Sequence, residues 1–178
     1  MSEQSLERIT LGGGCFWCLD AVFERVRGVE RVESGYCNGQ HLRPNYEQVC
    51  SGNTGHAEVV RLDFDPQVVS LRELLEVFFT IHDPTSLNRQ GADVGTQYRS
   101  GIYWHTPAQE ALALEVLAEV NAHHAGRVVT ELLPETNYHP AEAYHQQYYA
   151  RNPDQGYCAF VVAGKVDKFL ASFKRLVK

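Results

Sequence analysis

The residues of this 178-residue chain best suited to chemistry are the thiols of GGGCFWC, the stretch from Gly12 to Cys18. Three glycines run into Cys15 at the point where an apolar pattern with helical spacing begins. A thiol at a helix N-terminus lies near free backbone N–H groups and the positive end of the helix dipole, which stabilise the thiolate. The position therefore predicts a lowered pKa and a nucleophilic Cys15. A buried helix-start cysteine, with Phe16 and Trp17 in the core, is the alternative.

A second chemical group, the carboxyl of Glu58, begins a segment that reads HAEVVRLDF and alternates like a β-strand. Glu58 is in phase with Val60 and Leu62, so we expect it on the apolar face, whereas Arg61 and Asp63 share the other face. Reduced hydration raises the pKa of a carboxyl group, which then holds its proton at neutral pH. A protonated carboxylic acid suits general acid catalysis. The alternative is a solvated glutamate at a frayed strand end.

The spacing of the cysteines and their neighbours shows which other kinds of thiol chemistry are possible. A phosphatase loop needs an arginine six residues after the cysteine, and neither Cys15 nor Cys18 has one. The two cysteines do fit the C-x-x-C pattern of a thioredoxin-like dithiol, which stays open. A zinc site needs a second ligand pair, and Cys37 and Cys50 are too far apart to form one. We expect Cys37 and Cys50 to be buried thiols. A Cys–His hydrolase is conceivable with eight histidines, but none is singled out.

The composition argues against several classes of protein. The net charge is -6 and no run of Lys or Arg forms a basic face, so nucleic-acid binding is not expected. The apolar stretches are too short to span a membrane, and the first ten residues lack the apolar core of a signal peptide. Five cysteines, an odd number, argue against a secreted disulfide framework. We therefore expect a cytoplasmic protein with one domain over residues 1–178.

Alternating strand and helix patterns must position these groups. A helix is expected from Cys15 to a stop at Gly28, a second after the capping box that starts at Ser70, a third from Pro107 to Gly126, and a last one near the C-terminus. Strands are expected over residues 7–11, 29–36, 57–64, 101–105 and 128–133.

The order of these elements, β-α-β-β-α-β, predicts an α+β two-layer sandwich with a ferredoxin-like core and a mainly antiparallel sheet. We expect long irregular loops over residues 36–56 and 82–100, and coil toward the C-terminus. Long irregular segments in a compact domain are usually functional, so part of the site is expected there.

Four segments together resemble one family, the peptide methionine sulfoxide reductases of type A. They are GGGCFWC at 12–18, NYEQVCSGNTGHAEVV at 45–60, HDPTSLNRQGADVGTQYRSGIY at 82–103 and AEAYHQQYYARNPDQGYC at 141–158. The resemblance covers most of the chain. It implies an oxidoreductase that reduces methionine S-sulfoxide, free and in proteins, and so repairs oxidised proteins under oxidative stress.

The resemblance also implies roles for individual residues. Cys15 would attack the sulfoxide sulfur and become a sulfenic acid, while Glu58 would protonate the sulfoxide oxygen. Tyr46 and Tyr98 match the two phenols that hold this oxygen in the family. Asp93 matches an acid that helps to position the substrate.

Further matches concern the pocket and the second thiol. Phe16 and Trp17 match the ring pair that encloses the methyl group of the substrate. Gly14 is expected to bind the substrate beside them. Cys158, in the tail motif NPDQGYC, matches the thiol that resolves the sulfenic acid. Cys18 is one helical turn from Cys15 and is the alternative resolving thiol.

The family implies thioredoxin as the partner that reduces the resulting disulfide, with dithiothreitol as a laboratory substitute. No metal and no organic cofactor is implied, and we expect a monomer. A general dithiol–disulfide oxidoreductase working through Cys15 and Cys18, and a non-enzymatic binder of methionine-rich peptides, are the competing functions.

Overall fold

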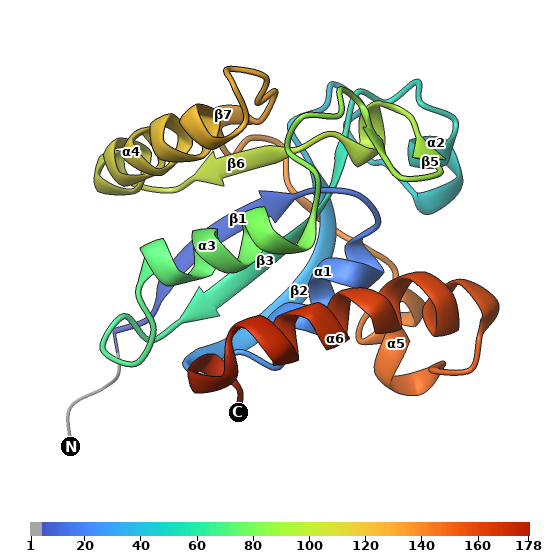
Figure 1. Cartoon of the computed structure of the whole chain (residues 1–178). Coiled ribbons are helices and arrows are strands. Elements are labelled where there is room, and N and C mark those ends of the chain that lie inside the picture. Colours follow the sequence, from blue (N-terminus) through green and yellow to red (C-terminus); the bar gives the residue numbers. More distant parts are fainter. Residues whose placement is uncertain (1–4) are drawn as a thin grey trace.

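The computed structural model describes residues 5–178 and is built around one large sheet (Figure 1). The strand order in this sheet is β7-β6-β1-β3-β2-β8. Within the described residues every neighbouring pair is antiparallel except β6 and β7. The strands are β1 (Glu7–Gly12), β2 (Val29–Cys37), β3 (Ala57–Phe64), β6 (Gly101–Trp104), β7 (Glu131–Pro134) and β8 (His139–Pro140). The inner order β6-β1-β3-β2 confirms the ferredoxin-like, mainly antiparallel prediction.

The long helices form the second layer and share one apolar core with the sheet. They are α1 (Phe16–Phe23), α3 (Leu71–Ile81), α4 (Pro107–His123) and α6 (Ala163–Ser172). Shorter elements are α2 (Tyr46–Cys50), α5 (Tyr148–Arg151), the β4 (Arg89–Gln90) and β5 (Asp93–Val94) hairpin, the 3-10 turns η1 (Thr96–Tyr98), η2 (Ala143–His145) and η4 (Lys174–Leu176), and the π-helical turn η3 (Cys158–Val162). Within the described residues, no helix is long and apolar enough to cross a membrane.

The sequence patterns explain why these elements form. In β1 the side chains of Ile9 and Leu11 are fully buried in the core, as period-two alternation requires. At the start of α3, Ser70 accepts a hydrogen bond from the backbone N–H of Glu73, and the Glu73 carboxylate accepts one from the N–H of Ser70. This is the predicted capping box, which satisfies two N–H groups that the helix leaves free.

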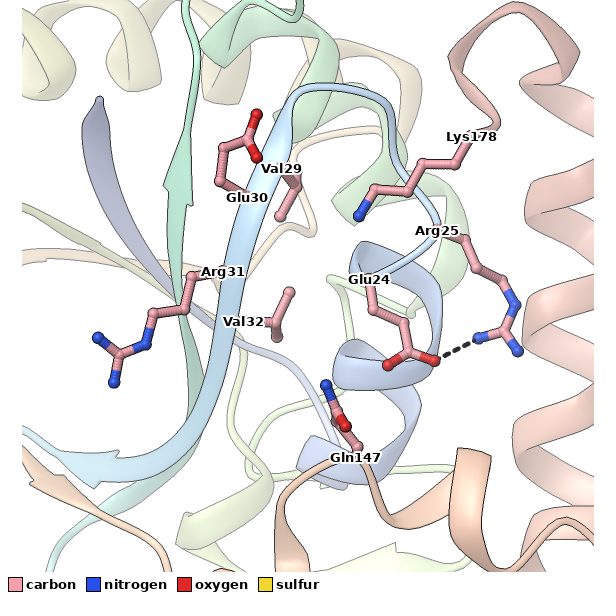
Figure 2. A pocket seen from close by; sticks show the side chains of 8 residues that line it. All are labelled: Glu24, Arg25, Val29, Glu30, Arg31, Val32, Gln147 and Lys178. Carbon is pink, nitrogen blue, oxygen red and sulfur yellow. Dashed lines mark hydrogen bonds and ion pairs between the residues drawn. The ribbon is translucent and has the colours of Figure 1, made fainter. Parts of the chain in front are cut away.

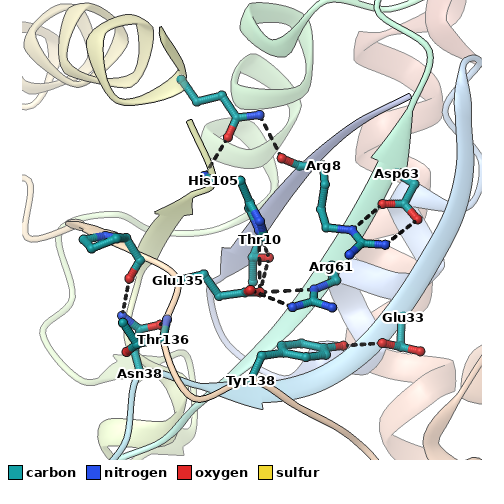
Figure 3. Close-up of polar contacts among 12 residues, drawn as sticks. Arg8, Thr10, Glu33, Asn38, Arg61, Asp63, His105, Glu135, Thr136 and Tyr138 are labelled. Carbon is teal, nitrogen blue, oxygen red and sulfur yellow. Dashed lines mark hydrogen bonds and ion pairs between the residues drawn. The ribbon is translucent and has the colours of Figure 1, made fainter. Parts of the chain in front are cut away.

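The other face of the sheet carries a network of polar side chains and is crossed by residues 135–138 (Figure 3). Arg61 of β3 donates two hydrogen bonds to the Glu135 carboxylate, at 2.6 and 3.2 Å, and its guanidinium lies 3.7 Å from the centre of the Tyr138 ring. Thr10 also donates to Glu135. A bidentate pair with a cation–π contact fixes this crossing segment, which leads on to part of the site.

The end of α1 and the start of β7 differ from the predictions. Helix α1 ends at Phe23 instead of reaching Gly28, because the N–H groups of Arg25 and Val26 bond to carbonyls only three residues back and the last turn tightens. Gly28, with φ +91, forms the turn into β2 instead. Strand β7 begins at Glu131, the first residue that pairs with β6, and not at residue 128.

The segments expected to be irregular contain short regular pieces. Residues 36–56 hold α2, where Asn45 and Gln48 form a second capping box. Residues 82–100 hold the β4–β5 hairpin and η1. The expected C-terminal coil includes η2, α5 and η3 before the predicted terminal helix. These pieces are too short for a periodic sequence signal, and tertiary contacts hold them in place.

Candidate active site

Cys15 occupies the N-cap position of α1, directly after β1 and the glycine turn. Gly14 has φ +83, and an added Cβ would come within 3.0 Å of the Cβ of Gln90. The backbone N–H of Gly14 donates to the carbonyl of Tyr98 at 3.1 Å. Glycine is therefore required on two counts, conformation and space. The turn joins the cysteine to η1 and leaves Cys15 only 9% exposed.

The structure contradicts the predicted lowering of the Cys15 pKa. Burial raises the pKa of this thiol well above its ordinary value of 9.0, and the negative charge of Glu58 and the nearby Cys18 raise it further. A hydrogen bond from the backbone N–H of Trp17 acts in the lowering direction, as expected at a helix start, but it is the weaker effect. The resting Cys15 is a thiol at neutral pH.

Glu58 is 1% exposed on the apolar face of β3, which confirms the prediction from alternation. Its Oε1 accepts a hydrogen bond from the backbone N–H of Phe16 at 3.2 Å, next to Cys15. Its Oε2 is buried and has no hydrogen-bond partner within residues 5–178. Burial raises the pKa of Glu58 from 4.5 to about 8. The carboxyl group therefore carries a proton at neutral pH and lies beside the thiol.

Two phenols lie on the same side of the site. Tyr46 begins α2 and Tyr98 ends η1, and both are partly buried. Burial is the main reason that the pKa of each phenol is raised, and the charges of Glu58 and Cys15 raise both further. The structure thus brings together four residues, Cys15, Glu58, Tyr46 and Tyr98, from four separate elements. Protonated phenols can donate hydrogen bonds to an oxygen that gains negative charge.

The two aromatic residues after Cys15 are surrounded by other rings. Phe16 is fully buried and packs on Tyr46, with ring centres 6.4 Å apart. Trp17 is stacked on Tyr148 with centres 3.8 Å apart and an angle of 5°. The indole N–H of Trp17 donates to Nδ1 of His145 at 3.0 Å. The neighbours of Phe16 and Trp17 form a largely apolar wall beside the thiol.

Sequence reasoning did not single out His145 or Glu142. His145 is 1% exposed, and burial lowers its pKa. Glu142 accepts hydrogen bonds from the Tyr36 hydroxyl at 2.8 Å and from the backbone N–H of Tyr46 at 2.9 Å. Both residues stand in the motif AEAYHQQYY, which gave a resemblance but no chemical reason to choose one position. Their roles follow from contacts with residues about 100 or more positions away in the chain.

All five cysteines are free thiols. Cys18 is fully buried, and its sulfur lies 3.9 Å from the hydroxyl oxygen of Tyr157. The same hydroxyl donates to the carboxylate of Asp93 in the β4–β5 hairpin. Cys158 begins η3, is buried, and its charge is among those that raise the pKa of Cys18. Asp93 therefore lies near both Cys15 and Cys18, and Cys158 lies near Cys18.

Of the other two cysteines, Cys50 lies beside Tyr46, whose pKa is raised by burial and then by this thiol. Cys37 is buried against Ala57, Val59 and Tyr103, as predicted. Cys50 is exposed at the end of α2, so its predicted burial is wrong. The helix is only one turn long, and its outward face cannot be recognised from so short a pattern.

A pocket of about 440 Å³ lies at the other end of α1 (Figure 2). None of the predicted site residues lines it. Its lining residues are Glu24, Arg25, Val29, Glu30, Arg31, Val32, Gln147 and Lys178. In the described residues, no three His, Cys, Asp or Glu side chains gather as metal ligands would.

A buried thiol, a buried protonated carboxyl group and two phenols on an α+β scaffold define an enzyme of the thiol-dependent class. Comparison with known proteins identifies the family. The family described as Peptide methionine sulfoxide reductase matches residues 7–176, which is nearly the whole chain. The chain belongs to this family, and the resemblance seen in the four segments is confirmed.

Individual relatives agree with this assignment. Peptide methionine sulfoxide reductase MsrA of Polynucleobacter asymbioticus is 55% identical over 97% of this chain and 92% of its own length. Methionine sulfoxide reductase A of Corynebacterium diphtheriae superposes with a TM-score of 0.80 at 38% identity, over 89% of this chain and 80% of that one. Mxr1 of Saccharomyces cerevisiae in reduced form gives a TM-score of 0.81 at 36% identity, over 88% and 91% of the two chains. Mxr1 in complex with Trx2 gives 0.58 at 26% identity, over 83% and 87%.

Proposed function

We propose that Cys15 is the nucleophile and Glu58 the proton donor of a methionine sulfoxide reductase that acts on the S epimer. Reduction of methionine sulfoxide itself follows from membership of the family. The observation that best supports these two roles is the pairing of a buried thiol with a buried carboxyl group whose pKa is about 8. Both groups hold protons at neutral pH, so the free site already contains the acid that the reaction needs.

The chemistry of the proposed first step balances within the site. The sulfur of Cys15 attacks the sulfoxide sulfur, and Glu58 gives its proton to the sulfoxide oxygen. The hydroxyl then passes to the Cys15 sulfur, which becomes a sulfenic acid, and methionine leaves with two more electrons than the sulfoxide had. The proton that Cys15 gives up restores Glu58. Tyr46 and Tyr98 donate hydrogen bonds to the oxygen while its negative charge is largest.

The aromatic wall suits the remaining part of the substrate. Phe16 and Trp17 enclose the methyl group, which has no hydrogen bonds to offer and is favoured by an apolar surface. Asp93 helps to orient the substrate from the β4–β5 hairpin. Gly14 leaves space for the close approach of the substrate to the thiol.

The second step consumes the sulfenic acid. We propose that the thiol of Cys158 attacks the Cys15 sulfur, so that a disulfide forms and water leaves. Cys18 is the alternative, because it also lies close to Cys15. Thioredoxin then reduces the disulfide through its own dithiol, in line with the Mxr1 structure that contains Trx2. Dithiothreitol supplies the same two electrons in the laboratory, and no organic cofactor or metal takes part.

The cellular setting remains a proposal. Methionine sulfoxide arises by oxidation of methionine, so we propose a function in the repair of oxidised proteins under oxidative stress. Five free cysteines and a thioredoxin-dependent cycle need a reducing compartment, so we retain the cytoplasm as the expected location. We also propose that residues 1–178 form a single domain and that the protein is a monomer.

The proposed chemistry can be tested with the two enantiomers of methyl p-tolyl sulfoxide and dithiothreitol, with chiral chromatography to follow each form. We expect loss of the S form alone, abolished in Cys15→Ser. Loss of neither form, or unchanged turnover in Cys15→Ser, would contradict the proposal. Thioredoxin-supported turnover then separates the resolving thiols: Cys158→Ser should stop it, whereas Cys18→Ser should leave it within about twofold.

A further inference from the structure

Asp20 is a buried carboxyl group that the proposed chemistry does not use. It lies three residues after Trp17 in α1, so the two side chains share one face of the helix. Asp20 is 1% exposed. Its Oδ2 accepts a hydrogen bond from the backbone N–H of Gln147 at 2.7 Å. Its Oδ1 is also buried and has no hydrogen-bond partner in the part of the chain that the structure describes. A buried acid with one bare oxygen is costly and calls for a functional reason.

The partner of Asp20 is a strained turn. Gln147 has φ 51 and ψ 40, the left-handed region that non-glycine residues rarely adopt, and it joins η2 to α5. We call residues 143–151 the clasp. Within the clasp the guanidinium of Arg151 donates to the carbonyls of Ala143, Tyr144 and Gln146. The clasp is therefore a compact turn held together by Arg151.

Residues of the clasp on both sides of Gln147 contact the indole of Trp17. His145, before Gln147, accepts the hydrogen bond from the indole N–H at 3.0 Å. Tyr148, directly after Gln147, stacks on the indole at 3.8 Å. The left-handed turn is what allows residues on both of its sides to face the same ring.

Besides the hydrogen bond between Trp17 and His145, hydrogen bonds through Gln146 and Asp20 tie the clasp to β2 and α1. Gln146 exchanges hydrogen bonds with the backbone N–H and carbonyl of Ser34 in β2. Asp20 supplies the corresponding contact on the α1 side. Of the two side chains that anchor the clasp, Gln146 and Asp20, only Asp20 is titratable.

We propose that Asp20 is a positioning residue for the Trp17 side of the substrate pocket. It fixes the turn at Gln147, and that turn presents His145 and Tyr148 to the indole. The proposal rests on the proposed role of Trp17 in binding the substrate methyl group. It concerns the clasp alone and is separate from the roles of Cys15 and Glu58.

The charge state of Asp20 makes this anchor sensitive to pH. Burial, and then the charge of Glu24, raise the pKa of Asp20 to about 7, while the N–H of Gln147 and the charges of Arg25 and Arg151 act in the opposite direction. Other titratable or charged groups near the turn are His145 of the clasp itself, whose pKa burial lowers, and Glu30, Arg31 and Lys178, which line the same pocket as Gln147 (Figure 2). When the clasp leaves α1, the carboxyl group becomes hydrated and its pKa returns toward about 4.

The sign of the effect follows from proton binding. The closed clasp binds a proton on Asp20 between about pH 4 and pH 7, and the open clasp does not. The contribution of Asp20 to closing is therefore largest at low pH and weakens as the pH rises through this window. Near pH 7 most of this loss has already occurred, because above that pH the closed form ionises as well.

Amide hydrogen exchange at Gln147, followed by NMR, tests the anchor directly. In the unmodified protein the protection factor of this N–H should fall by at least about tenfold between pH 5 and pH 7.5. Asp20→Asn keeps an acceptor oxygen but no titrating charge, so protection should be retained and lose this pH dependence. Asp20→Ala should lose most of the protection at every pH, and Asp167→Asn, on the exposed side of α6, is the matched control. Full protection in Asp20→Ala, or an unchanged pH dependence in Asp20→Asn, would overturn the proposal.

Kinetics with dithiothreitol connect the anchor to the pocket. Asp20→Ala should raise the KM for the sulfoxide about tenfold with kcat changed less than about twofold, because the pocket wall is loosened and the reacting groups are not. Asp20→Asn should keep the KM of the unmodified protein. If Trp17→Phe leaves KM unchanged, the proposed substrate pocket is wrong, whereas the exchange result at Gln147 still decides whether Asp20 anchors the clasp. If Asp20→Ala is too unstable to study, the pH dependence in Asp20→Asn remains decisive.

Discussion

Replacement of Glu58 by Gln should separate catalysis from stability. Gln has nearly the same shape and can still accept the hydrogen bond from the backbone N–H of Phe16, but it cannot give a proton to the substrate. We expect turnover with dithiothreitol to fall by a factor of about 100 to 10,000. In the unmodified protein the rate of sulfoxide reduction should decline as the pH rises through about 8, because the acid form of Glu58 is lost.

The same substitution should make the protein more stable at high pH. Burial raises the pKa of Glu58 from 4.5 to about 8, so the folded state holds this proton more tightly than the unfolded state does. The carboxyl group therefore destabilises the fold as the pH rises through this window. At about 1.4 kcal/mol for each pKa unit, the full effect above pH 8 is roughly 5 kcal/mol. At pH 5 it is less than about 1 kcal/mol.

Urea unfolding at pH 5 and pH 9 measures this directly. The difference in free energy of unfolding between Glu58→Gln and the unmodified protein should grow by roughly 4 kcal/mol from the lower to the higher pH, in favour of the variant. Glu76→Gln, on the exposed side of α3, is the matched control and should show no such growth. If the Gln variant were equally stable or less stable at pH 9, or retained full activity, the reasoning about a buried proton donor would be refuted.

Three other substitutions test the phenol, the core and the capping box. Tyr46→Phe should lower kcat/KM about tenfold or more with little change in the urea midpoint, since only the oxygen-binding hydroxyl is removed; unchanged kinetics would exclude this role. Leu74→Ala, at a fully buried position in α3, should cost about 2 to 5 kcal/mol in urea unfolding, and a loss below 1 kcal/mol would mean that the core refills the cavity. Ser70→Ala should cost about 1 kcal/mol in the same assay, because the N–H of Glu73 loses its acceptor; no loss would show that solvent replaces the cap.

Local sequence patterns predicted the parts of the site that depend on position within a single element. Glu58 could be assigned to the apolar face because side chains alternate along a strand, and its raised pKa followed from that assignment. Cys15 could be assigned to a helix start because glycines precede a helical pattern. The capping box at Ser70 and Glu73 needed only residues three apart.

Long-range contacts could not be predicted in this way. The exposure of Cys50 depends on how one turn of helix sits on the loop. After α1 ends at Phe23, the backbone N–H of Arg27 donates to the carbonyl of Leu176 and that of Lys178 donates to the carbonyl of Arg25. His145 and Asp20 gave no local signal, since each acquires its role from a partner that lies more than 120 positions away.

The sequence by itself determined the order of the longer strands and helices, the family through four matched segments, and the chemical groups of the site. Only the tertiary structure decided the protonation state of Cys15. Cys15 shows the physical reason: a helix start favours the thiolate through local N–H groups, yet the surrounding chain removes water and places Glu58 nearby. Desolvation is the larger effect, and it depends on everything packed around the thiol, which no local pattern records.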